Sequence, residues 1–111
     1  MEEPGIDRHE FETEWEDLRP FVEESPGEAL PEVDRLVARL MESRGLPLEE
    51  RPGDELAERE TTREFAEARR ITRLLEAGED VDPGDVAHAV NAYSSLYAEL
   101  LHAGPGAGAP G

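Results

Sequence analysis

Residues 81–103, VDPGDVAHAVNAYSSLYAELLHA, contain the clearest helix signal in the chain and decide its fold class. Asp82 has a side chain suited to a helix N-cap, and Pro83 suits the first helical position because its missing N–H would have no partner there. Apolar residues then recur with the period of a helix over about four turns. These residues are Val86, Val90, Tyr93, Tyr97, Leu100 and Leu101. We therefore predict a helix over residues 83–103.

The segment before this helix predicts a second helix, over residues 61–77, with two alternative starts. One start is Asp54, which would give a long helix. The other is Thr61, which forms a capping box with Glu64 just before the apolar residues. We favour Thr61, because a continuous helix from Asp54 would place Glu60 on the apolar side. Gly78 is expected to end the helix in the left-handed conformation.

A third helix is predicted over residues 26–44, with a possible later start at residue 31. Ser25 and Pro26 form a start pattern, but Pro31 leaves the first helical residue open. A clear apolar stripe runs through this segment, and it consists of Leu30, Val33, Leu36, Val37, Leu40 and Met41. Gly45 is expected to end the helix, with Arg44 favourably placed at the negative end of the helix dipole.

The N-terminal segment predicts a helix over residues 8–19, with Asp7 as its N-cap. Phe11, Trp15 and Leu18 recur at helical spacing. Pro20 lacks an N–H and clashes with the preceding turn, so we expect the helix to end or kink there.

Together these segments predict an all-α fold, a small antiparallel bundle of three to four helices, because no strand pattern is present. Residues 1–103 are predicted to form one helical domain, since the chain length fits one domain. The tail at residues 104–111 contains only glycine, proline and alanine and is predicted to be disordered, as is the N-terminus.

The composition excludes several classes of partner and chemistry. The 111 residues include 28 acidic residues against 11 arginines, which gives a formal net charge of −17. This charge repels nucleic acid and anionic membranes, so we expect neither as a direct partner. The absence of cysteine excludes a disulfide, a thiolate nucleophile and a cysteine metal site. No run approaches the roughly 18 apolar residues of a membrane helix, and the acidic start does not read as a signal peptide, so we expect a cytoplasmic protein.

The acidic residues are concentrated near the N-terminus. Residues 1–34 carry 13 acidic residues and 2 arginines, whereas residues 35–53 have a net charge of +1. The N-terminal helix is therefore expected to be an acidic rod. Such a helix suggests one functional hypothesis, an acidic inhibitor or nucleic-acid mimic that acts on a basic partner.

The helix over residues 83–103 has an unusual outer face. It carries one formal charge after Asp85, at Glu99, although 35% of the chain is charged. The face opposite the apolar stripe holds Ala92 together with His88, Asn91, Ser95, Glu99 and His102. Depletion of charge with retention of polar side chains is typical of contact surfaces. We predict that these five polar residues bind a partner, with a central position inside the bundle as the alternative explanation.

No motif predicts catalysis, and we expect no catalytic residue and no cofactor. The chain lacks a glycine-rich phosphate loop and a nucleophile elbow. The pairs Asp85–His88 and Glu99–His102 have the spacing that carboxylate–histidine metal bundles use, but both histidines fall opposite the apolar stripe. A metal-binding bundle is therefore the least favoured hypothesis. The favoured one is a non-catalytic module that binds another protein or a second copy of itself.

Overall fold

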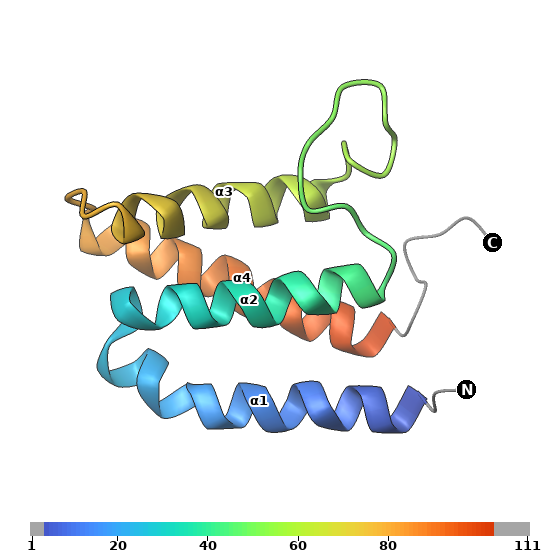
Figure 1. Ribbon diagram of the computed structural model, residues 1–111, viewed down its shortest axis with the longest axis horizontal. Coiled ribbons are helices and arrows are strands. Elements are labelled where there is room, and N and C mark those ends of the chain that lie inside the picture. The colour runs from blue at the N-terminus through green and yellow to red at the C-terminus, as the bar shows by residue number, and fades with distance from the viewer. Residues whose placement is uncertain (1–3, 104–111) are drawn as a thin grey trace.

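The computed structural model describes residues 4–103 and the side chains of residues 8–102. The described residues form four helices and no strand, which confirms the predicted all-α bundle (Figure 1). The helices are α1 (Pro4–Glu24), α2 (Pro26–Ser43), α3 (Glu60–Glu76) and α4 (Pro83–Ala103). The predicted disordered tail at residues 104–111 lies outside the described part of the chain. Within that part, no helix is both long and apolar enough to cross a membrane.

The four helices run alternately in opposite directions, and α2 and α4 form the centre (Figure 1). Helix α1 packs mainly on α2, α3 packs mainly on α4, and α1 and α3 are not in contact. The Cα atoms extend over 42 × 35 × 18 Å, so the bundle is flat. The contact between α1 and α4 is correspondingly slight, which leaves one side of α4 without a covering helix.

The predicted helix over residues 83–103 is confirmed at both ends by α4. The backbone carbonyl of Asp82 accepts the hydrogen bond of Val86 N–H at 3.1 Å, which begins the helix. Gly45 and Gly78 adopt φ values of 78° and 81° and end α2 and α3 as predicted.

Helix α3 begins at Glu60, close to the favoured start, but the predicted capping box is wrong. Arg59 is the N-cap residue and makes no side-chain cap, so Thr61 and Glu64 lie inside the helix. The neighbouring Thr62 is fully buried, and its hydroxyl lies 3.1 Å from the Pro47 carbonyl and 3.3 Å from the Leu56 carbonyl. Thr62 thereby holds the connector of residues 44–59 against the start of α3.

The predicted bounds of the first helix are wrong at both ends. Helix α1 already begins at Pro4, so Asp7 is not its N-cap, and it continues through Pro20 to Glu24. Pro20 is exposed and lacks the N–H that would donate to the Glu16 carbonyl. Ser25 N–H still donates to the Phe21 carbonyl at 2.8 Å, so helical hydrogen bonding resumes after the proline.

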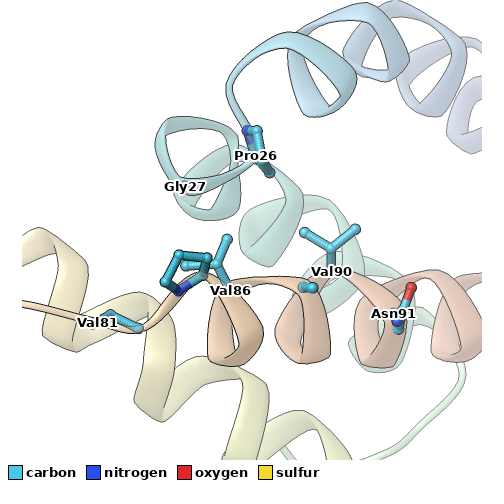
Figure 2. A pocket seen from close by; sticks show the side chains of 8 residues that line it. Pro26, Gly27, Val81, Val86, Val90 and Asn91 are labelled. Atoms are coloured by element: carbon cyan, nitrogen blue, oxygen red, sulfur yellow. The ribbon is translucent and has the colours of Figure 1, made fainter.

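Helix α2 begins at Pro26, and Pro31 lies inside it, which settles the alternative left open by the sequence. Ser25 makes no side-chain cap, contrary to the start pattern. It is the one residue between α1 and α2, and this tight corner lies over the beginning of α4. Pro26 and Gly27 face Val86 and Val90 there (Figure 2).

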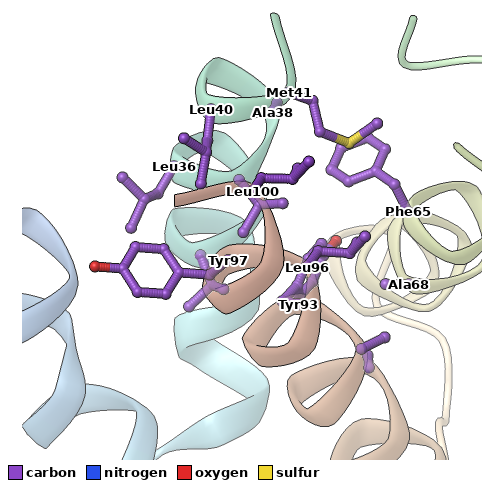
Figure 3. Packing of buried hydrophobic residues seen from close by; sticks show 14 of the residues in the cluster. Leu36, Ala38, Leu40, Met41, Phe65, Ala68, Tyr93, Leu96, Tyr97 and Leu100 are labelled. Atoms are coloured by element: carbon purple, nitrogen blue, oxygen red, sulfur yellow. The ribbon is translucent and has the colours of Figure 1, made fainter. Parts of the chain in front are cut away.

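One apolar core joins all four helices. Leu36 and Leu40 of α2 meet Leu100 of α4, while Phe65 of α3 lies near Tyr93 (Figure 3). The Phe65 and Tyr93 rings meet edge to face, with centroids 6.0 Å apart. The apolar stripes predicted for α2 and α4 are buried or half-buried.

A buried polar cluster joins α2, α3 and α4 through hydrogen bonds. Asp34 of α2 is 2% exposed and accepts hydrogen bonds from Arg69 of α3 at 2.7 and 3.1 Å. The Tyr93 hydroxyl of α4 donates to the same carboxylate at 2.7 Å and lies 2.8 Å from the Thr72 hydroxyl. Burial raises the pKa of Tyr93 far above its ordinary value, so the hydroxyl stays protonated and keeps its donor role.

Arg44 joins the ends of α2 and α4. Its side chain is 1% exposed, and it donates to the carbonyls of Leu100 and Leu101 at 2.7 and 3.3 Å. These carbonyls belong to the last turn of α4, whose C=O groups have no partner within the helix. Besides standing at the end of its own helix, Arg44 therefore neutralises the C-terminal end of α4.

Candidate functional site

The structure leaves exposed the whole set of five residues predicted to bind a partner. All five lie on α4, and they are His88, Asn91, Ser95, Glu99 and His102. Ala92, which the same periodicity placed on this face, is 6% exposed and belongs to the core. Ala87 and Ala98 are exposed and extend the face toward α1. We call the exposed residues of α4 from Ala87 to His102 the α4 face.

One edge of the α4 face meets acidic side chains of α3. The pKa of Glu64 is raised, mainly by burial and then by the charges of Glu99 and Glu60, while His88 acts in the opposite direction. The pKa of Glu67 is lowered, chiefly because Arg70 donates a hydrogen bond to it. The like charges of Glu60, Glu64 and Glu99 thus meet at this edge, while Arg70 pairs with Glu67 at 2.7 Å.

The other edge of the α4 face descends into an apolar hollow of about 440 Å³ (Figure 2). The corner between α1 and α2 forms one wall, and the start of α4 forms the other. The lining residues are Pro26, Gly27, Val81, Pro83, Val86, Ala87, Val90 and Asn91. Asn91 belongs both to this lining and to the predicted binding residues, so the two features are continuous.

A second hollow of about 210 Å³ follows between α1 and α4. Trp15, Leu18 and Val22 line it from α1, with Arg19 and Glu23 at the edge, and Ser94 lines it from α4. Ser94 lies one helical turn beyond Val90, so both hollows follow the same side of α4. Trp15 stacks on Tyr97 with ring centroids 4.3 Å apart and closes the far end. We call the two hollows together the α1–α4 groove.

The groove exists because α1 packs mainly on α2 and makes few contacts with α4. Phe11 is buried, but Trp15, Leu18 and Val22 are only half-buried against the core. Trp15 stacks on Tyr97 of α4, whereas Leu18 and Val22 line the open hollow between the two helices. Sequence periodicity identifies these residues as apolar, but it carries no information on how far α1 stands from α4.

The exposed polar side chains of α4 can donate and accept hydrogen bonds. Among the described residues, no group of three or more histidine or acidic side chains is placed to hold a metal ion. His88 and His102 are exposed and point away from the core. The buried Asp34 and Tyr93 bind each other, and neither lines the two hollows described above.

The acidic residues of α1 form a second exposed surface, separate from the α4 face. Glu10, Glu12, Glu16 and Asp17 are exposed, while Glu14 is half-buried and pairs with Arg39 of α2. Helix α1 is the peripheral helix of the bundle, so its outer carboxylates face solvent.

Comparison of the chain with protein-family models, with curated proteins and with solved structures gave no match.

Proposed function

We propose that this protein is a non-catalytic helical module that binds another protein through the α4 face and the adjoining α1–α4 groove. The single observation that carries this proposal is the continuity of the two features. An apolar groove, which water covers poorly, adjoins the one helix face that almost lacks charge.

Burial within the chain does not account for the composition of the α4 face. If neighbouring helices covered this face, the scarcity of charge would follow from packing. Its five predicted residues are exposed instead, while most surface positions of α1 carry a charge. A contact with another molecule supplies a reason for the difference.

Site-specific photocrosslinking in the cells that produce the protein tests this proposal. A photoreactive residue at Asn91 or Ser95 is expected to give a discrete adduct, whereas the same residue at Glu42, exposed near the end of α2, is expected to give none. The adduct mass separates a different protein from a second copy of this chain. Equal labelling from all three positions, or none from Asn91 and Ser95, would refute the proposal.

A second candidate function is inhibition of a basic protein through the carboxylates of α1. The observation that favours it is the exposure of six acidic side chains in the described part of this peripheral helix. A photoreactive residue at Asp17 distinguishes the two candidates. An adduct from Asp17 without one from Asn91 would favour α1 as the binding surface.

A further inference from the structure

Exposed acidic residues outnumber basic residues along the walls of the α1–α4 groove. The groove begins where the α1–α2 corner and the α3–α4 turn lie at the same end of the bundle, opposite the connector of residues 44–59 (Figure 1). Residues 20–34 and 74–103, which supply most of these walls, contain no lysine or arginine. Arg19, at the edge of the second hollow, pairs with Glu16 at 3.1 Å. Six exposed carboxylates flank the lining residues in sequence, and they are Glu23, Glu24 and Glu28 on one side and Glu79, Asp80 and Asp82 on the other.

No ion pair found in the described residues joins one of these rim carboxylates to an arginine. The ion pairs found in the described residues join Arg19, Arg35, Arg39, Arg51, Arg63, Arg69, Arg70 and Arg73 to other acids. An apolar floor between two acidic rims complements a ligand that is apolar along its centre and basic along its flanks.

This charge pattern disfavours a second copy as the occupant. The chain carries a net charge of −17, and residues 1–34 alone carry −11, so a copy in the groove would bring like charges together. The tail at residues 104–111 contains no charged residue and no large apolar residue, so it does not complement the groove either.

We propose that the α1–α4 groove binds a basic amphipathic helix of a partner protein, with the apolar side of that helix on the groove floor and its lysines or arginines against the acidic rims. This inference rests on the proposed function and names the chemistry of the partner. From Val86 to Ser94 the α4 wall is about 12 Å long, which accommodates slightly more than two helical turns. Amphipathic helices bind apolar grooves through anchors spaced three and four residues apart, a spacing that matches such a wall.

The experiment uses synthetic peptides as probes and Trp15 as the reporter. Trp15 is the one tryptophan of the chain and lines the second hollow, so its fluorescence responds to groove occupancy. The probe is an 18-residue tryptophan-free peptide with leucines along one helical side and arginines on both flanks. Three further peptides replace the arginines with glutamine, replace them with glutamate, or scramble the order at constant composition. Backbone amide shifts at residues 81–94 locate the binding.

A matched pair of protein variants separates the groove from the general acidity of the chain. The rim variant carries Glu24→Gln, Glu28→Gln and Asp82→Asn. The distal variant carries Glu42→Gln, Glu49→Gln and Glu55→Gln, at exposed positions near the 44–59 connector. Both variants lose three charges, so non-specific attraction falls equally in the two.

The basic amphipathic peptide is expected to change Trp15 fluorescence saturably, with shifts confined to the groove. The rim variant is expected to bind it about tenfold more weakly than the distal variant, because three exposed ion pairs are lost. Equal affinity for the rim and distal variants, or for the scrambled peptide, would overturn the inference. If the glutamine peptide binds the groove as tightly as the arginine peptide, the basic partner is refuted while the proposed function stands. If no peptide shifts the backbone amide signals of residues 81–94, the proposal of a basic amphipathic helix as the ligand is also refuted. The proposed function is then tested separately, by the photocrosslink at Asn91.

Discussion

Removal of the Tyr93 hydroxyl by Tyr93→Phe tests whether the buried polar cluster stabilises the bundle. The hydroxyl donates to the Asp34 carboxylate at 2.7 Å and lies 2.8 Å from the Thr72 hydroxyl. It is the one group of α4 in a cluster that otherwise joins α2 to α3. Phenylalanine keeps the ring and its contact with Phe65 but removes this link.

The expected loss follows from what each partner retains. A hydrogen bond to a charged group contributes about 1.5–3 kcal/mol. Asp34 keeps both bonds from Arg69, and Thr72 keeps its bond to the Ala68 carbonyl, so neither is left without a partner. We therefore expect a loss of about 2 kcal/mol in the free energy of unfolding. With an unfolding entropy near 0.2 kcal/mol/K for about 100 ordered residues, Tm falls by about 10 °C.

Urea unfolding monitored by circular dichroism measures this loss, and Tyr97→Phe is the control. Tyr97 is 8% exposed and stacks on Trp15, but no hydrogen bond of its hydroxyl is found in the described residues. The control is expected to lose less than about 0.5 kcal/mol. If Tyr93→Phe costs no more than Tyr97→Phe, the cluster does not stabilise the fold as argued here.

The pH dependence gives a second measurement on the same variant. Burial raises the pKa of Tyr93 in the folded protein above the ordinary value of 10.0, so the folded state holds a proton that the unfolded state releases. The contribution of Tyr93 is therefore complete below pH 10.0 and is lost as the pH rises above it. Because Tyr97 is present in both proteins, the unfolding free energy should decline less steeply above this pH in Tyr93→Phe than in the wild type.

Three further predictions concern charged residues. Arg44→Lys should lower the free energy of unfolding by about 2 kcal/mol, because the lysine ammonium cannot reproduce the forked hydrogen bonds to the last turn of α4. Amide hydrogen exchange in that turn should accelerate, and unchanged exchange would contradict this role of Arg44. Glu64→Gln should raise Tm at pH 7 but not below the ordinary pKa of 4.5, because the raised pKa of Glu64 makes its carboxylate unfavourable only once the pH passes that value. An equal gain at both pH values would assign the effect to something other than charge. Sodium chloride should raise Tm of the wild type by screening the net charge of −17, and a fall with salt would mean that the surface ion pairs outweigh the repulsion.

The helices themselves were predictable because their signals are local. The start at Pro83 and the ends at Gly45 and Gly78 each depend on a few adjacent residues whose backbone preferences are strong. Local rules failed where distant packing decides. Helix α1 continues through Pro20, and Leu18 before the proline and Val22 after it both pack against the shared core.

Two of the strongest polar contacts could not be predicted from the sequence. Asp34 and Tyr93 are 59 positions apart, and Arg44 and Leu100 are 56 apart. Only the order and crossing of the helices bring these groups together. The same holds for the groove, because its apolar residues look like ordinary core residues until the position of α1 shows that α4 does not cover them.

The charges of the α4 face and of the groove rim are best explained together. In a protein with a net charge of −17, acidic residues are expected at most solvent-facing positions. After its first turn, however, α4 has Glu99 as its one acidic residue. The acids are present instead at the two turns that flank the groove, beside Pro26 and Val81. A surface shaped by solubility alone would spread carboxylates over both regions. A surface that must seat an apolar helix side and attract its basic flanks needs an uncharged floor with acidic borders, which is the distribution found here.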